Sequence, residues 1–66
     1  MHLVVNGQPM TFDELLSVAE LVVHLGYDRA LVAVERNQEV VPRRTWDEAQ
    51  LQDNDEIEVV TFVGGG

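Results

Sequence analysis

One short segment with helical periodicity, residues 17–26, most restricts the folds open to this chain. Four apolar residues recur there at helical spacing and form one stripe: Val18, Leu21, Val22 and Leu25. Ser17 and Glu20 match the capping-box pattern, in which a hydroxyl and a carboxylate satisfy the unpaired N–H groups at a helix start. Gly26 stands where a helix commonly ends. We therefore predict one helix over residues 18–25, and this helix needs a sheet to cover its apolar stripe.

The sequence also contains an earlier helix start. Thr11 and Glu14 match the same capping-box pattern. A helix from that point would be longer and apolar over most of its surface, because leucine, valine or alanine fills most positions between 15 and 25. We favour the later start and predict that residues 13–16 are the connection to the helix.

The chain opens with a predicted β-hairpin. Residues 2–5 are mostly apolar and are followed by Asn6-Gly7, the strongest two-residue hairpin signal. Both central positions of a type I′ turn need positive φ, which Asn and Gly tolerate. The second strand of this hairpin is expected at residues 9–12, where Pro9 is tolerated at the first position.

A second hairpin is predicted after the helix. Residues 31–36 read as a strand, Asn37-Gln38 supplies a turn, and residues 39–41 form a short partner strand. Pro42 ends it, because proline has no N–H to donate to a continuing ladder.

A short helical turn and a final strand complete the predicted elements. The segment from Thr45 to Glu48 is another capping-box pattern and predicts a single helical or 3₁₀ turn that begins at Trp46. Trp46 and Leu51 are expected to anchor this turn to the edge of the core. Asn54 tolerates the left-handed conformation of a tight turn, and the last strand is expected at residues 56–63.

This order of elements predicts an α+β fold, with a mixed sheet of about five strands packed on one main helix plus a short helical turn. The last strand has the strongest β composition, so we expect it in the centre of the sheet, beside the first strand. This is the β-grasp, ubiquitin-like arrangement. A chain of 66 residues makes one domain with a thin core; we expect this domain at residues 1–63 and a flexible glycine tail at residues 64–66.

The end of the chain carries the predicted working group. An apolar run leads directly into Gly64-Gly65-Gly66. Glycine has no side chain, so such a tail can lie in a channel too narrow for other residues. The chemically active group left there is the α-carboxylate of Gly66, and Gly64 and Gly65 would let it thread into a partner. The alternative is a glycine run with linker chemistry and no further role.

Composition restricts the function classes. A chain this short cannot enclose a deep substrate pocket, which argues against a self-sufficient enzyme. Twelve acidic residues against four arginines and no lysine give a formal net charge of −8. This charge argues against nucleic-acid binding and favours a partner with a basic face, or simple solubility. Cysteine is missing, and the two histidines lie far apart in sequence, so neither a thiolate nor a metal-ligand pattern is indicated.

Other sequence features point to a cytoplasmic protein. The first residues show no basic and apolar pattern of a signal peptide and no membrane span, so a cytoplasmic location is the default expectation. His24 falls near the predicted helix end and is expected to be a surface residue. Arg43 and Arg44 are interpreted as solvated loop residues or as contacts to an acidic partner surface.

Side-chain alternation predicts a docking face. In the last strand, Ile57, Val59, Thr61 and Val63 would face the helix, while Glu56, Glu58, Val60 and Phe62 would face outward. In the first strand, Leu3 and Val5 would be buried, and His2 and Val4 exposed. In the third strand, Val32 and Val34 would be buried, and Leu31, Ala33 and Glu35 exposed. We thus expect an apolar patch of Val4, Val60 and Phe62, rimmed by carboxylates, as a partner docking site.

The residues resemble a known family over the whole chain. The resemblance rests on Val5-Asn6-Gly7, Ser17-x-x-Glu20-Leu21, Asn37-x-x-Val40-Val41-Pro42-Arg43-x-x-Trp46, Leu51-x-Asp53-Asn54-Asp55-x-Ile57-Glu58 and the Gly65-Gly66 end. These segments are similar to the ThiS-type sulfur carrier proteins of thiamine biosynthesis. Two positions depart from that pattern: Asn54 replaces the usual glycine, and Gly64 makes the tail a triple glycine.

The resemblance implies a role as a carrier that acts as a cosubstrate, not as an enzyme. An E1-like adenylyltransferase (ThiF-type) would use ATP to join the carboxylate of Gly66 to AMP, and the carrier itself would bind no cofactor. Sulfur from a donor such as a cysteine desulfurase would then give a thiocarboxylate on Gly66. A thiazole synthase (ThiG-type) would accept that sulfur.

Three other functions stay open on the sequence. The first uses the same chemistry: a small subunit of molybdopterin synthase, or a carrier for another sulfur pathway. The second is a ubiquitin-like protein modifier that forms isopeptide bonds with target lysines. The third is a binding module that acts without covalent chemistry.

Overall fold

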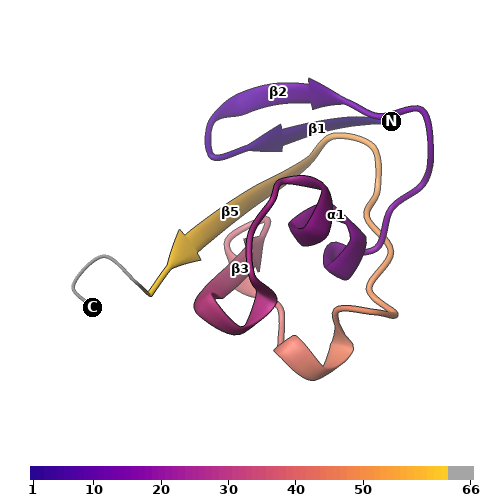
Figure 1. Cartoon of the computed structure of the whole chain (residues 1–66). Helices are drawn as coiled ribbons and strands as arrows, with labels where there is room; N and C mark the ends of the chain where they lie inside the picture. Colours follow the sequence, from indigo (N-terminus) through magenta and orange to yellow (C-terminus); the bar gives the residue numbers. More distant parts are fainter. Residues whose placement is uncertain (63–66) are drawn as a thin grey trace.

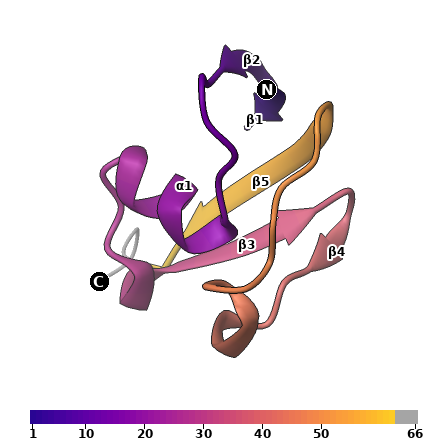
Figure 2. The ribbon, with the colours of Figure 1, turned by 90° about the vertical axis from the view of Figure 1, so that its right-hand side faces the viewer.

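Within residues 1–62, the part of the chain that the computed structural model describes, five strands form one mixed sheet. In chain order the elements are β1 (His2–Val5), β2 (Gln8–Thr11), α1 (Val18–His24), the 3₁₀ turn η1 (Arg29–Leu31), β3 (Val32–Arg36), β4 (Glu39–Val40), the 3₁₀ turn η2 (Arg43–Thr45) and β5 (Asp55–Thr61). Figure 1 shows this arrangement, and Figure 2 shows the sheet after a quarter turn, with α1 against one of its faces. The predicted α+β β-grasp arrangement is confirmed.

The last strand lies in the centre of the sheet, as predicted. The strand order is β2-β1-β5-β3-β4. β5 runs parallel to β1, with Val5 beside Ile57, and antiparallel to β3, with Val34 beside Val59. The two hairpins of the chain therefore lie on either side of its C-terminal strand.

The first hairpin turns at Asn6 and Gly7, both of which have positive φ, 50° and 81°. The Asn6 side chain fixes this turn to the central strand, because its Oδ1 accepts a hydrogen bond from Val59 N at 2.8 Å. Asn6 N in turn donates to Ile57 O at 2.8 Å. Asn37 and Asn54 also adopt positive φ, which confirms the turns predicted there.

The helix begins where the second capping box predicts. Glu20 N donates to Ser17 Oγ at 3.1 Å, and Ser17 N donates to Glu20 Oε1 at 2.8 Å. At the other end, Gly26 has φ 84°, its N–H bonds Val23 O, and the next N–H, from Tyr27, bonds Val22 O at 3.1 Å. This pair of bonds is a Schellman motif, which ends the helix one residue before the predicted position.

No helix within residues 1–62 is long and apolar enough to cross a bilayer.

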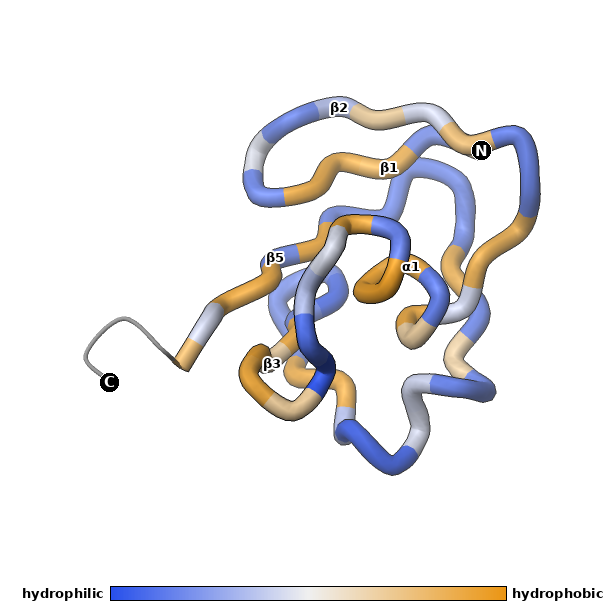
Figure 3. The backbone as a smooth tube through the Cα atoms, viewed as in Figure 1, coloured by the Kyte–Doolittle hydropathy of each residue, from blue (hydrophilic) through white to orange (hydrophobic). Residues whose placement is uncertain are grey.

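The core lies between α1 and one face of the sheet. Its buried apolar residues are Leu3, Val5, Phe12, Val18, Ala19, Leu21, Val22, Val32, Val34, Trp46, Leu51, Ile57 and Val59. Figure 3 shows that the apolar stretches lie on the strands and helix, whereas the loop around η2 is hydrophilic. Trp46 and Leu51, predicted at the core edge, are 1% and 2% exposed and belong to the core itself. Trp46 Nε1 donates to Val41 O at 2.9 Å.

The position predicted for the short helical turn is wrong. The turn begins at Arg43, and Trp46 stands at its C-terminal cap. The reason is local: Thr45 Oγ1 donates to Pro42 O at 2.8 Å and so closes the preceding turn instead of capping a following one. Leu31 likewise belongs to η1 and not to the third strand.

A buried carboxylate organises the start of β5. Asp55 Oδ2 accepts hydrogen bonds from Arg36 Nε at 2.8 Å and from Gln52 N at 2.7 Å, and its Oδ1 accepts one from Asn37 Nδ2 at 3.0 Å. Burial alone would raise the pKa of this carboxyl. The hydrogen bonds and the positive charge of Arg36 more than offset that effect, so the pKa of Asp55 lies below its ordinary value.

Candidate functional site

The predicted working group falls beyond the described residues. Gly66, predicted to be modified, and Gly64 and Gly65, predicted to thread into a partner, lie outside residues 1–62, as does Val63. The structure describes the platform to which these residues are attached.

This platform is the end of the central strand. β5 ends at Thr61, and the next residue still bonds to the neighbouring chain segment, because Phe62 N donates to Leu31 O at 2.8 Å. Leu31 is the last residue of η1, directly before β3. Figure 1 shows the C-terminal end of β5 at the margin of the fold, so the chain reaches residue 63 from an exposed position.

The predicted alternation of β5 is confirmed over most of its length. Ile57 and Val59 are buried, and Glu56, Glu58 and Val60 are exposed. Thr61, predicted to face the core, is exposed instead. It pairs with Val32 at the last position of β5, where the pairing of β5 with β3 ends.

Exposed apolar side chains gather at this end of β5. Val60 is 48% exposed and pairs with Ala33 of β3, and Phe62 is 61% exposed. Leu31, whose carbonyl accepts the Phe62 hydrogen bond, is 42% exposed. We name Leu31, Val60 and Phe62 the terminal patch. Side-chain alternation predicts that Leu31 is exposed, but its position beside Phe62 comes from the pairing of η1 with the end of β5, which alternation does not indicate.

The structure places Val4 apart from the terminal patch. Val4 is half-buried and pairs with Pro9 on one side and Glu56 on the other. Glu56 precedes Val60 by four strand positions, which corresponds to about 13 Å along β5. The predicted patch of three residues is therefore divided, and acidic side chains stand between its parts.

Three of these carboxylates share one shallow depression. Its volume is about 320 Å³, and it is lined by Val4, Gly7, Glu35, Gln38, Glu56, Ile57 and Glu58. Glu35 lies directly opposite Glu58 in the β3–β5 register. Like charges in this position destabilise a sheet. The sequence predicts Glu35, Glu56 and Glu58 on the outer face, but their juxtaposition depends on a register that only the fold supplies.

The two candidate arginines have different surroundings. Arg43 Nη2 donates to Val32 O at 2.6 Å, and its guanidinium lies 5.3 Å from the centroid of the Trp46 ring. Arg44 is exposed, and its side chain makes no hydrogen bond or ion pair with any residue between 1 and 62. Arg43 therefore has a structural contact, and Arg44 is the one left to solvent or to a partner.

His24 is exposed at the end of α1, with its ring 5.1 Å from that of Phe12 in an edge contact, as expected for a surface residue. Within the described part of the chain, no three His, Asp or Glu side chains are grouped so that they could hold a metal ion.

The fold places the chain in a class. A mixed sheet with the C-terminal strand in its centre and one capped helix on one face defines a β-grasp, ubiquitin-like protein. The ThiS family model matches residues 3–66. The chain belongs to the ThiS family.

Individual relatives agree with this assignment. The sulfur carrier protein ThiS of Escherichia coli is 33% identical over the full length of both chains. The crystal structure of a thiamine biosynthesis protein (ThiS) from Geobacter metallireducens superposes with a TM-score of 0.85, at 42% identity and with all of both chains covered. A thiazole synthase of Paramagnetospirillum magneticum is 42% identical over all 66 residues, but the chain spans only 20% of the length of that relative.

Proposed function

We propose that this chain is a sulfur carrier of thiamine biosynthesis. A partner enzyme activates the carboxylate of Gly66, which is then converted to a thiocarboxylate that donates the sulfur. The observation that carries this proposal is that the family match extends through residue 66 and thus includes the glycine end. The full-length likeness to the Escherichia coli sulfur carrier supports it.

The chemistry explains why such a carrier needs another enzyme. A carboxylate is a poor electrophile, because attack would add charge to an already charged, resonance-stabilised group. An E1-like adenylyltransferase (ThiF-type) would let a carboxylate oxygen of Gly66 attack the α-phosphorus of ATP, with pyrophosphate leaving. A persulfide formed by a donor such as a cysteine desulfurase would then attack the carbonyl carbon, and AMP would leave with that oxygen. A thiol would cleave the S–S bond of the resulting acyl disulfide, which leaves the thiocarboxylate on Gly66 and a disulfide as the second product. The carrier supplies no general acid or base in these steps.

The proposed sulfur acceptor is a thiazole synthase (ThiG-type). The relatives named thiazole synthase in Paramagnetospirillum magneticum and Magnetococcus marinus each contain a segment 42% identical to this whole chain. A carrier-like segment within the same polypeptide as a synthase supports a functional partnership between the two. We propose that the separate chain serves the same kind of acceptor.

We further propose that the terminal patch docks the activating enzyme. Val60 and Phe62 are exposed apolar residues next to the root of the tail, which suits an interface core. Glu58, two positions before Val60 in β5, and Glu35 and Glu56 near it suit a partner with basic residues around its apolar surface. Val4 lies on the same face. An interface that includes both Val4 and the terminal patch would also have to cover these carboxylates.

Intact mass spectrometry tests the proposal. The chain is incubated with ATP, Mg²⁺, an E1-like adenylyltransferase and a sulfur donor. We expect the mass gain of one oxygen-to-sulfur exchange, located at Gly66 by fragmentation, and no gain in a variant that lacks Gly65 and Gly66. Transfer of the whole chain to other proteins would instead indicate a protein modifier, and an unchanged mass with partner binding would indicate a binding module.

A further inference from the structure

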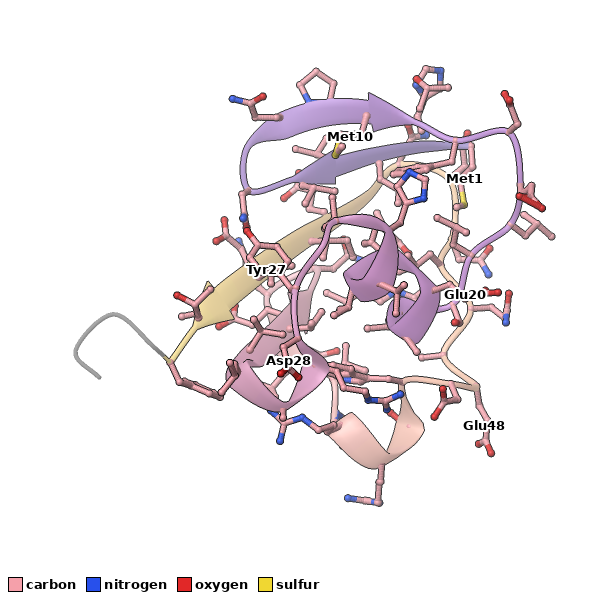
Figure 4. All side chains as sticks on the ribbon, in the orientation of Figure 1. Met1, Met10, Glu20, Tyr27, Asp28 and Glu48 are labelled. Carbon is pink, nitrogen blue, oxygen red and sulfur yellow. The ribbon has the colours of Figure 1, made fainter. Side chains whose placement is uncertain are left out.

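The short turn η1 needs support from outside itself. It has three residues, and none of them is buried. Its own hydrogen bonds are the backbone bond from Leu31 N to Asp28 O at 2.9 Å and one side-chain cap, in which Ala30 N donates to Asp28 Oδ1 at 2.9 Å; Asp28 is labelled in Figure 4. Hydrogen bonds in 3₁₀ turns have poor geometry, so we expect contacts with the rest of the fold to contribute to the position of η1.

The position of Phe62, the residue from which the tail continues, depends on η1. Phe62 is the last described residue, and its N–H donates to the carbonyl of Leu31 in η1. Any displacement of η1 therefore changes where Phe62 lies and the direction in which the chain continues to residue 63.

Two arginines and a tryptophan fasten η1 to the rest of the fold. The guanidinium of Arg29, the first residue of η1, lies 5.4 Å from the Trp46 ring centroid, and that of Arg43 lies 5.3 Å from it. Such distances are those of cation–π contacts. Trp46 is a fixed platform, since it is 1% exposed and its Nε1 is hydrogen-bonded. We name Arg29, Arg43 and Trp46 the arginine clamp.

Further hydrogen bonds join the clamp to both neighbouring segments. Arg29 Nη1 lies 3.3 Å from Asp47 Oδ1, and its Nη2 lies 3.5 Å from the Arg43 carbonyl oxygen. Arg43 Nη2 donates to Val32 O, one residue after η1. The clamp thus holds η1 and the first residue of β3 against the loop that follows η2.

We propose that the arginine clamp is a positioning device for the C-terminal tail: by fixing η1, it fixes the point and direction at which the chain leaves the sheet at Phe62. This inference rests on the proposed function, in which residues 63–66 enter the active site of an activating enzyme. A tail of four residues spans at most about 14 Å. Because the tail is this short, a displacement of Phe62 also displaces the reacting carboxylate of Gly66, and the residues between them cannot compensate for it.

The test compares Arg29→Gln with Arg44→Gln. Both variants remove one positive charge, but only Arg29 belongs to the clamp. In Arg29→Gln we expect faster hydrogen exchange at the Phe62 amide, by about tenfold. The Asn6 amide, which bonds Ile57 O at the other end of β5, serves as the internal reference and should keep its protection.

The second readout is adenylation by the E1-like enzyme. A misplacement of about 1 Å can cost up to about a hundredfold in rate, and we expect the turnover of Arg29→Gln at saturating carrier to fall by about tenfold. Its KM should rise by a smaller factor than the turnover falls, because the variant keeps all three side chains of the terminal patch and changes only the position of Leu31 and Phe62. Arg44→Gln should match the native chain in both readouts.

Several results would overturn the proposal. One is a Phe62 amide that is already unprotected in the native chain. Another is an Arg29→Gln variant in which the exchange of Phe62 or the adenylation turnover is unchanged, and a third is an equal loss of protection and turnover in Arg44→Gln. A rise in KM without a fall in turnover would show a docking role instead. Failure of the native chain to be adenylated at all would overturn the proposed function, whereas the exchange of Phe62 would still decide whether the clamp fixes η1.

Discussion

Gly65 stands next to the residue whose carboxylate we propose is activated, and its role depends on having no side chain. We expect Gly65→Val to reduce adenylation by about a hundredfold or more, because a branched side chain would hold the reacting group away from its position in the channel. The melting temperature should not change, since position 65 follows the last strand. Thermal unfolding and pyrophosphate exchange measure the two effects. Native-like adenylation in the variant would show that no narrow channel receives the tail.

Phe62 allows a test of docking that is separate from folding. Its side chain is 61% exposed, so Phe62→Ala should change the free energy of unfolding by less than about 0.5 kcal/mol. If Phe62 anchors the interface, the same variant should raise the KM for adenylation about fivefold to tenfold.

The matched control for Phe62 is Val40→Ala. Val40 is 69% exposed on β4, away from the terminal patch, and its removal should leave the KM unchanged. Equal KM values for Phe62→Ala and the native chain would remove Phe62 from the docking surface.

At the scale of elements, the central strand depends on the Asp55 network at its start. Asp55→Asn keeps the side-chain shape but leaves Arg36, which is only 26% exposed, without its counter-charge. We expect a loss of about 2 kcal/mol in the free energy of unfolding at pH 7, because hydrogen bonds to charged groups are involved. Asp13→Asn, at an exposed position in the connection before α1, is the control and should have little effect.

The pH dependence of this contribution has a definite sign. The pKa of Asp55 is lower in the folded chain than its ordinary value of 3.8. Its stabilising contribution is therefore fully present above that ordinary value and is lost as the pH falls through the folded pKa. The stability difference between the native chain and Asp55→Asn should accordingly shrink below about pH 4, as measured by urea unfolding across pH. A difference that stays constant down to pH 2 would contradict the lowered pKa.

Local elements were predictable because their signals are local. Ser17 and Glu20 are three residues apart and define the helix start, and Asn6-Gly7 defines its own turn. The sequence could not reveal the register between strands that are distant in the chain. For this reason the separation of Val4 from Val60 and the opposition of Glu35 to Glu58 emerged only from the fold.

The remaining differences have the same physical origin. The helical turn moved to η2 because Thr45 has two possible hydrogen-bond partners, and the pattern indicates only one of them. The arginine clamp joins Arg29 to residues 14 and 17 positions later, and no spacing rule covers such a contact. The predicted tail chemistry lies outside the described residues and stays a prediction.

At the scale of the whole molecule, the formal charge of −8 is large for 66 residues. An acidic body is steered toward a basic partner, and this long-range attraction weakens as salt shortens the screening length from about 30 Å at 0.01 M to about 8 Å at 0.15 M. We therefore expect the association rate constant with the activating enzyme to fall by about tenfold or more over this range, while the dissociation rate constant changes less.

Two single-charge variants separate the overall field from the local contact. Glu48 projects from the loop after η2 (Figure 4), and Glu58 lies beside the terminal patch. Glu48→Gln and Glu58→Gln each make the net charge of −8 less negative by one, so both should reduce the association rate by a similar small factor at low salt. Only Glu58→Gln should also raise the dissociation rate, because only Glu58 would contact basic residues in the complex. Stopped-flow measurements of association and dissociation test both predictions. Equal dissociation rates for the two variants would place the carboxylates of the depression outside the interface. An association rate that does not respond to salt would show that the acidic composition serves solubility alone.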